Sequence, residues 1–287
     1  MITPSRLRKL ASIAVVLVSP VAAQPSIAKP EANADRDSIA SDAERTIDPS
    51  QYKLTFSEEF DGPLDVSAWG PGTKWIAHTP FNGDFGNSRF ADPQPGFPFA
   101  TKDGQLRIEA SKDKKGQWWS GLLASVDRKY NGFAQKFGYF EMRAKLPEGP
   151  GLWPAFWLIG INRKEKTYTA EIDVLEHYGH MPDRFSTGII IYNRNNERGN
   201  HYKRNTRIPV PKGSLYSGFN TWGVAVDETL IRVYLNRKEV WRTPSEPEFH
   251  QPMFVLLNLA MGPGWPIDKT PNPSYMYVDY VRAWQRE

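Results

Sequence analysis

Three carboxylates are concentrated in one short apolar stretch, Thr169 to Gly179, which reads Thr-Ala-Glu-Ile-Asp-Val-Leu-Glu-His-Tyr-Gly. Its β-branched residues predict a strand. Side chains of a strand alternate between two faces, so Glu171 and Asp173 share one face. Glu176 has the opposite parity, and one extra residue held in a β-bulge near Val174 and Leu175 would return it to that face. The stretch therefore predicts a row of three acids.

Paired carboxylates are what hydrolysis of a glycosidic bond requires, because one attacks the anomeric carbon while the other donates a proton to the leaving oxygen. With the bulge, Glu171 and Glu176 lie roughly 13 Å apart at Cα, at ~3.3 Å per strand step. Long side chains leaning inward on a concave sheet would close most of that gap. Asp173 between them would hydrogen-bond the attacking group and, as a like charge, raise the pKa of the acid. The alternative is a solvated strand face carrying ordinary surface acids.

The acid row and four further segments resemble glycoside hydrolase family 16, the laminarinase and β-glucanase family. Glu-Ile-Asp-Val-Leu-Glu is similar to that family's Glu-x-Asp-x-x-Glu signature in its bulged form. The other segments follow in the family's order and are Gly-Tyr-Phe-Glu-Met-Arg-Ala-Lys-Leu-Pro (138–147), Gly-Leu-Trp-Pro-Ala-Phe-Trp-Leu-Ile (151–159), Leu-Asn-Leu-Ala-Met-Gly (257–262) and Val-Asp-Tyr-Val-Arg (278–282). The resemblance extends from about residue 54 to the C-terminus.

This resemblance implies an all-β fold, a β-jelly-roll sandwich of two curved antiparallel sheets with a concave glycan-binding cleft. It also implies a retaining mechanism in which Glu171 is the nucleophile, Glu176 the acid/base and Asp173 the assisting carboxylate. Independently, regular strands with turn signals and almost no helical periodicity favour a sandwich. The expected function is a secreted endo-β-glycosidase acting on β-1,3/β-1,4-linked glucan. A non-catalytic glycan-binding jelly roll and a transglycosylase on the same scaffold are the alternatives.

Composition divides the chain into three parts. Residues 1–23 combine basic residues, a short apolar run and small side chains before Gln24, as in a cleavable signal peptide. Residues 24–50 lack aromatics and carry more acids than bases, which predicts a disordered linker. Residues 51–287 suit one catalytic domain. We therefore expect a secreted protein, extracellular or periplasmic.

The charge pattern limits the partners. The chain has a formal net charge of +4 and no cysteine. Its bases are scattered, without the basic stripe of a nucleic-acid-binding protein. Beyond the signal peptide, no run is long and apolar enough to cross a membrane. We expect a monomer that binds a polysaccharide, and neither nucleic acid nor a membrane.

Aromatic residues near the acid row predict sugar contacts, because their rings stack on pyranose faces. Trp153 and Trp157 share one face of the strand 151–159, and filling the core is the alternative for them. Arg143 projects from the strand 138–146, where an exposed cross-strand pair is the alternative. The remaining candidate substrate-binding residues are Trp75 and Asn82 in the long loop 70–99, Tyr178 beside the acid row, and Trp265 in the loop 262–265.

The loop 70–99 resembles exopolysaccharide-cleaving members of the family, such as succinoglycan glycanases of soil bacteria. With the basic segment 194–207, it favours an acid-decorated bacterial exopolysaccharide as substrate. The resemblance implies no cofactor for catalysis but a structural calcium ion held by backbone carbonyls and Asp279. An ion pair or a turn cap is the alternative for Asp279. An apolar residue, Ile190, stands where many family members place a histidine.

Overall fold

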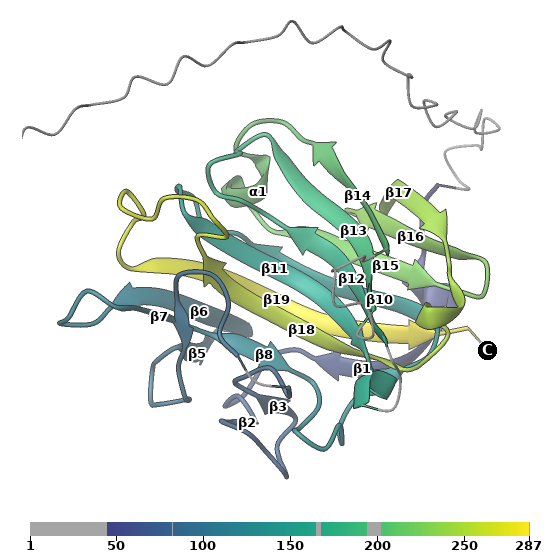
Figure 1. Ribbon diagram of the computed structural model, residues 1–287, viewed down its shortest axis with the longest axis horizontal. Coiled ribbons are helices and arrows are strands. Elements are labelled where there is room, and N and C mark those ends of the chain that lie inside the picture. Colours follow the sequence, from purple (N-terminus) through teal and green to yellow (C-terminus); the bar gives the residue numbers. More distant parts are fainter. Residues whose placement is uncertain (1–44, 82, 165–167, 194–201, 287) are drawn as a thin grey trace, which may run out of the picture. The chain divides into compact units, whose positions relative to one another are not determined.

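The computed structural model describes residues 45–81, 83–164, 168–193 and 202–286, which form two β-sheets packed face to face (Figure 1). The ten-stranded sheet contains β1 (Lys53–Glu58), β4 (Arg89–Phe90), β5 (Phe99–Lys102), β6 (Gln105–Lys112), β7 (Trp118–Ser120), β10 (Gly138–Lys145), β15 (Asn220–Val226), β16 (Leu230–Leu235), β17 (Lys238–Pro244) and β19 (Ser274–Gln285). The nine-stranded sheet contains β2 (Val66–Ser67), β3 (Trp75–Ile76), β8 (Leu122–Ala124), β9 (Ala134–Gln135), β11 (Leu152–Gly160), β12 (Tyr168–Glu176), β13 (Arg184–Asn193), β14 (Tyr202–Pro209) and β18 (Met253–Met261).

The strand order confirms the predicted jelly-roll sandwich. The ten-stranded sheet runs β17-β16-β15-β10-β19-β6-β7-β4, with β1 and β5 joined to β19 and β6. The nine-stranded sheet runs β14-β13-β12-β11-β18-β8-β3-β2, with β9 joined to β18. Both sheets are mixed rather than purely antiparallel, because the short pairs β2–β3 and β4–β7 are parallel. Helical structure in the described ranges is limited to α1 (Ser214–Ser217) and the 3-10 turns η1 (Pro49–Gln51), η2 (Ile161–Lys164) and η3 (Pro247–Phe249).

Strand alternation separates two apolar clusters. On β11, Phe156 and Leu158 join the main core between the sheets, while Trp157 and Ile159 belong to a second cluster on the other face of the nine-stranded sheet. That second face is the one on which the acids of β12 were expected. No helix in the described ranges is long and apolar enough to cross a membrane.

The predicted boundary between linker and domain at residue 51 is too late. Ile47 is 7% exposed and packs in a cluster with Tyr139, Tyr234 and Trp284. Its N–H donates to the carbonyl of Arg237 at 3.0 Å. Composition missed this segment because one buried isoleucine does not change the average of a polar stretch. The predicted signal peptide and the rest of the predicted linker, residues 1–44, lie outside the described residues.

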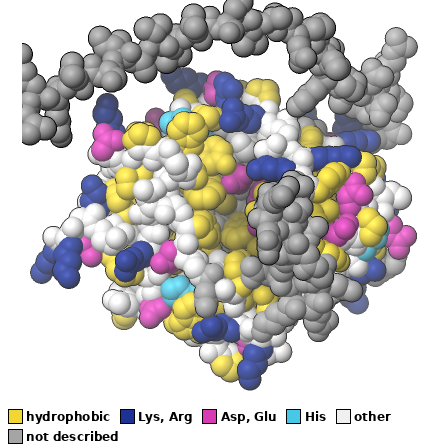
Figure 2. All heavy atoms as spheres, viewed as in Figure 1, with side chains coloured by type: hydrophobic (Ala, Val, Ile, Leu, Met, Phe, Trp, Pro, Cys, Tyr) yellow, Lys and Arg dark blue, Asp and Glu magenta, His cyan; other side chains and the backbone are white. Residues whose placement is uncertain are grey.

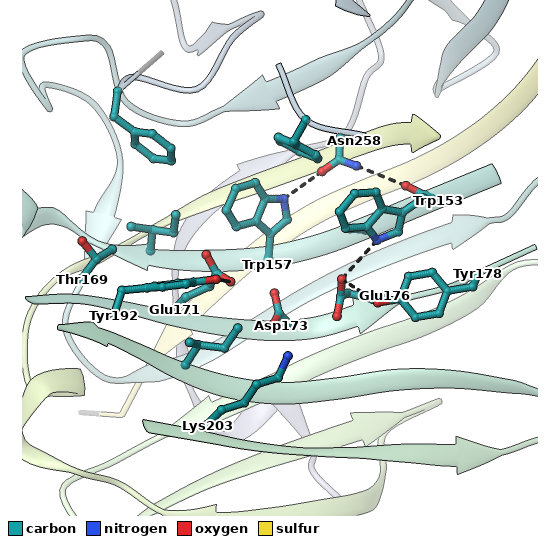
Figure 3. A pocket seen from close by; sticks show the side chains of 15 residues that line it. Trp153, Trp157, Thr169, Glu171, Asp173, Glu176, Tyr178, Tyr192, Lys203 and Asn258 are labelled. Carbon is teal, nitrogen blue, oxygen red and sulfur yellow. Dashed lines mark hydrogen bonds between the residues drawn. The ribbon is translucent and has the colours of Figure 1, made fainter. Parts of the chain in front are cut away.

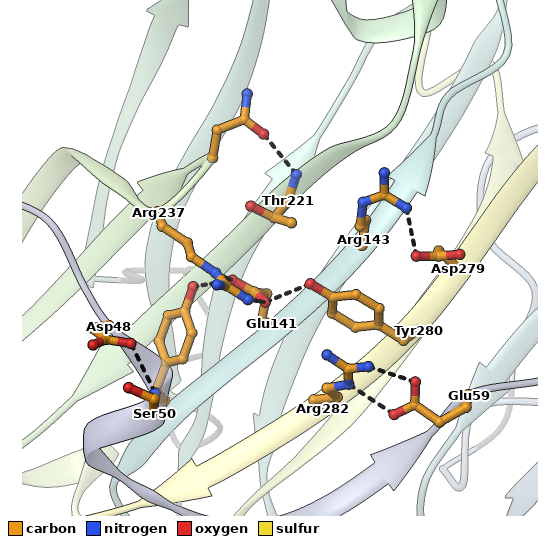
Figure 4. Close-up of polar contacts among 12 residues, drawn as sticks. Asp48, Ser50, Glu59, Glu141, Arg143, Thr221, Arg237, Asp279, Tyr280 and Arg282 are labelled. Carbon is orange, nitrogen blue, oxygen red and sulfur yellow. Dashed lines mark hydrogen bonds and ion pairs between the residues drawn. The ribbon is translucent and has the colours of Figure 1, made fainter.

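The ten-stranded sheet contains a fully buried carboxylate, Glu141. Figure 4 shows its polar partners. It accepts hydrogen bonds from the hydroxyls of Tyr139 at 2.7 Å and Tyr280 at 2.8 Å. Arg237 adds two guanidinium bonds, at 3.0 and 3.1 Å. The charge of Glu141 is therefore fully paired, which a buried carboxylate requires.

Arg143 lies on the same strand and donates to Asp279 at 2.5 Å. Because β10 belongs to the ten-stranded sheet, this arginine is not beside the acid row, and its prediction as a substrate-binding residue is wrong. The strand that carries Arg143 was predicted correctly, but the pattern of a single strand does not say which sheet that strand joins. Asp279 thus forms the ion pair that was the alternative to a calcium site at this residue.

Candidate active site

The acid row lies on β12, in the middle of the nine-stranded sheet. Asp173 pairs with Trp157 of β11, while Glu176 pairs with Ala155. Between these pairs, two residues of β12, Val174 and Leu175, therefore lie opposite one residue of β11, Phe156. The pairing of β12 with β13 shifts register at the same place, between Asp173 and Glu176. The predicted β-bulge is confirmed, and Val174, the extra residue, points into the main core. The bulge places all three acids on one face (Figure 3).

These acids line a cavity of about 550 Å³. Figure 2 shows hydrophobic side chains gathered around acidic ones on this face of the molecule. The lining residues are Phe81, Phe85, Trp153, Ala155, Trp157, Ile159, Thr169, Glu171, Asp173, Glu176, Tyr178, Ile190, Tyr192, Lys203 and Asn258. A largely apolar cavity with a few convergent polar groups is typical of a binding site for a small molecule or a polymer segment.

Strand register explains which residues surround Glu171. Ile159, Glu171, Ile190 and Lys203 are successive partners across β11, β12, β13 and β14. All four line the cavity, so the glutamate has an isoleucine on each side and a lysine one strand further on. Ile190, the residue that replaces the expected histidine, thus lies directly beside this acid.

Hydrogen bonds orient the two outer acids differently. The hydroxyl of Tyr192 donates to Glu171 at 3.0 Å. Glu176 accepts from the indole N–H of Trp153 and the hydroxyl of Tyr178, both at 3.1 Å and both on Oε1 (Figure 3). These contacts leave the second oxygen of Glu176 as the atom that can carry a proton toward a ligand.

The side chain of Asn258 links the two tryptophans of β11, Trp153 and Trp157. The indole N–H of Trp157 donates to Oδ1 of Asn258 at 2.9 Å, and the amide of Asn258 donates to the carbonyl of Trp153 at 3.3 Å. The side chain of Asn258 is fully buried. Asn258 therefore holds the ring of Trp157 at the wall of the cavity.

Burial raises the pKa of two acids. The pKa of Asp173 lies well above its ordinary value because the side chain is removed from water, with further contributions from the charges of Glu171 and Glu176. Burial also raises the pKa of Glu176, against the hydrogen bonds from Tyr178 and Trp153 and the charge of Lys203, which lower it. The pKa of Glu176 is thus raised mainly by desolvation and not, as predicted, by the charge of Asp173.

This burial has a cost in stability. A carboxyl whose folded-state pKa is raised binds more protons in the folded than in the unfolded chain, so stability falls as pH rises from the ordinary pKa through the folded one. We expect Asp173→Asn to unfold at a higher temperature than the wild type at pH 7, with the difference shrinking toward pH 3. Thermal unfolding followed by circular dichroism across this range checks it. A difference that does not change with pH would show that the folded-state pKa of Asp173 is not raised.

Several predicted binding residues line the cavity, and others do not. Trp153, Trp157 and Tyr178 do, whereas Trp265 is 42% exposed and packs on His180 outside it. The prediction for Trp75 is wrong, because its ring is fully buried and its N–H donates to Glu58 at 3.1 Å. Asn82 lies outside the described residues.

Sequence reasoning did not single out Tyr192, Asn258, Thr169 and Phe85, and it included Lys203 only as part of the basic segment 194–207. Asn258 had a signal, since it is a lone polar residue in an apolar strand. Tyr192 also had one, because it shares parity with Ile190 on β13. Thr169 also had a signal, because it shares parity with Glu171 on β12. Lys203 reaches the cavity through the pairing of β13 with β14, and Phe85 reaches it from a loop, neither of which a local pattern contains.

Comparison with known proteins identifies the family. Residues 99–282 match Glycosyl hydrolases family 16, and the chain belongs to this family. It is 31% identical over 261 residues to endo-1,3-1,4-beta-glycanase ExsH of Rhizobium meliloti, covering 83% of this chain and 53% of that protein. It is also 31% identical over 277 residues to endo-1,3-1,4-beta-glycanase EglC of the same organism, covering 88% and 56%. The chain thus spans about half the length of these relatives.

A solved structure shares the fold. The catalytic domain of an endo-1,3-beta-glucanase (laminarinase) from Thermotoga petrophila superposes with a TM-score of 0.63 at 25% identity, covering 82% of this chain and 98% of that one. This chain therefore shares its overall fold with that glucanase domain.

Proposed function

We propose that this protein is a retaining endo-β-glycosidase that hydrolyses β-1,3/β-1,4-linked glucan. The observation that carries the proposal is the bulged row of Glu171, Asp173 and Glu176 at the bottom of one cavity. The family membership and the names of the two Rhizobium relatives support the same reaction.

The proposed reaction has two steps. In the first, a carboxylate oxygen of Glu171 attacks the anomeric carbon and forms an ester, while the glycosidic bond breaks and the leaving oxygen takes the proton of Glu176. In the second, water attacks the same carbon, gives a proton back to Glu176, and releases Glu171 as a carboxylate. The hydroxyl of Tyr192 holds Glu171 in position, and Asp173 lies between the two reacting acids.

A non-catalytic glycan-binding module is the competing function. Such a module needs the aromatic walls but not a buried acid with a raised pKa beside a second carboxylate. The raised pKa of Glu176 costs stability and is of no use to simple binding, so it favours an enzyme. A transglycosylase would use the same ester with a sugar hydroxyl in place of water, and measurement of product sizes separates the two.

The substrate we propose is an acid-decorated bacterial exopolysaccharide. Lys203 lines the cavity, and both Lys203 and Arg207 are exposed on β14. Of the basic segment 194–207, residues 194–201 lie outside the described residues. The proposed enzyme acts as a secreted monomer, with neither nucleic acid nor a membrane as partner.

Substrate choice gives the test of this proposal. We expect higher activity on a succinoglycan-type exopolysaccharide than on neutral laminarin, and a decline with ionic strength for the charged polymer alone, because salt screens exposed charges. Lys203→Met should reduce the preference, while Lys114→Met, on an exposed turn of the ten-stranded sheet, should not. Equal, salt-independent activity on both polymers in a reducing-end assay would identify a generic β-glucanase.

The structural calcium ion also remains a proposal. Among the described residues, no group of three or more acidic or histidine side chains could hold a metal, so a site at Asp279 would depend on backbone carbonyls. We expect a chelator to lower the melting temperature without abolishing the activity of the folded protein. Complete loss of activity in a folded, chelated sample would contradict the two-carboxylate chemistry.

A further inference from the structure

A line of four aromatic rings leads away from Glu176. The first two, Trp153 and Tyr178, are its hydrogen-bond donors. Ring centroids lie 6.2 Å apart between Trp153 and Tyr178, 6.3 Å between Tyr178 and His180, and 4.3 Å between His180 and Trp265. We call these four residues the aromatic track.

The backbone after β12 explains the track. The N–H groups of His177 and Gly179 donate to carbonyls of β11 at 3.1 and 2.9 Å, so antiparallel pairing continues past the end of the strand. His177 is fully buried on the far side, and a Cβ on Gly179 would lie 1.8 Å from the carbonyl oxygen of Gly149. Alternation therefore leaves Tyr178 and His180 on the same side as the acids.

The loop after β18 supplies the last ring. The N–H of Gly262 donates to the carbonyl of Gly151 at 2.8 Å, which ties the start of the loop to β11. Gly262 and Gly264 adopt positive φ angles of 54° and 83°, a conformation that glycine tolerates best. The loop brings Trp265 against His180 and leaves 42% of the tryptophan exposed.

The third ring of the aromatic track, that of His180, is a neutral stacking surface. Burial, together with the charge of Arg207, lowers the pKa of His180, so its imidazole is uncharged near pH 7. Nε2 of His180 is buried and has no hydrogen-bond partner in the described part of the chain. Flat uncharged rings in a row present an apolar path on which successive sugar rings can stack.

We propose that the aromatic track binds the leaving-group side of the glycan, with His180 and Trp265 as the residues that determine specificity there. This inference rests on the proposed function. The acid of a glycosidase faces the departing oxygen, and the track continues beyond Glu176 on the side away from Glu171. Sugars that depart after cleavage therefore lie along Tyr178, His180 and Trp265.

A comparison of two substrates tests the track. β-Laminaribiosyl fluoride occupies only the side of the attacked sugar, because its leaving group is a fluoride ion, whereas lichenan occupies both sides. For His180→Ala and Trp265→Ala we expect kcat/KM on lichenan to fall about tenfold, equivalent to ~1.4 kcal/mol. The fall on the fluoride should be several times smaller, and His180→Phe should recover most of the lichenan activity because it keeps a flat ring.

Trp119→Ala is the matched control, because Trp119 is a partly exposed tryptophan on β7 whose N–H donates to Asp113, on the other sheet. It should leave both rates unchanged. Equal losses on the two substrates in the His180 and Trp265 variants, or no loss on lichenan, would overturn the track while leaving the proposed function intact. A wild type that turns over neither substrate would overturn the proposed function and the track with it.

Discussion

Replacing either outer acid of the row by its amide is expected to reduce glucan hydrolysis by several orders of magnitude. Glu176→Gln removes the proton donor, and a positioned general acid contributes roughly 10²–10⁴-fold. Glu171→Gln removes the attacking oxygen and should reduce turnover further, since the amide cannot form the ester. Both variants should fold and bind glucan, because Gln keeps the shape of Glu. Initial rates on lichenan and binding to the same polymer provide the measurement.

The control for these variants is Glu228→Gln. Glu228 is exposed on the turn between β15 and β16 of the ten-stranded sheet, so the same chemical change there should not alter turnover. If Glu171→Gln or Glu176→Gln hydrolysed glucan at a rate near that of the wild type, that residue would not have the role assigned to it.

Glu141→Ala should destabilise the fold by about 3–5 kcal/mol, the cost typical of breaking a buried ion pair by removing one partner. The change leaves the hydroxyls of Tyr139 and Tyr280 and the guanidinium of Arg237 without their shared acceptor. Burial raises the pKa of Tyr280 to about 12, so its hydroxyl stays a donor at neutral pH. Urea unfolding at pH 7 measures the loss.

An exposed pair on the same sheet serves as the comparison. Arg282 forms two bonds to Glu59, at 2.7 and 2.8 Å, but both side chains reach solvent. Arg282→Ala should therefore cost no more than ~1 kcal/mol. Equal losses for Arg282→Ala and Glu141→Ala would contradict the importance of burial in the Glu141 cluster.

The acid row was predictable because it depends on local periodicity. The parity mismatch of Glu176 required a bulge, and the structure places that bulge after Asp173. The same rule placed Trp153 and Trp157 on the face that lines the cavity. The alternation of side chains along individual strands thus predicted most of the candidate site.

Residues in loops and long-range partners were not predictable in this way. Trp75 lies in a segment without periodicity, where a large ring is equally suited to binding sugar and to filling the core. The partner of Asp279, Arg143, lies 136 residues away in the sequence. Asn258 and Trp157, which share a hydrogen bond, are 101 residues apart in the sequence. Such contacts depend on which strands become neighbours, and that information is not local.

The stereochemistry of azide rescue tests the proposed mechanism most directly. In Glu176→Ala, Glu171 still forms the ester with an activated β-glycoside such as β-laminaribiosyl fluoride, and a small anion can then attack the ester without a general base. Azide should restore turnover and yield a β-glycosyl azide, identified by the anomeric proton coupling in its NMR spectrum. An α-glycosyl azide would show a single inverting displacement and contradict Glu171 as the nucleophile.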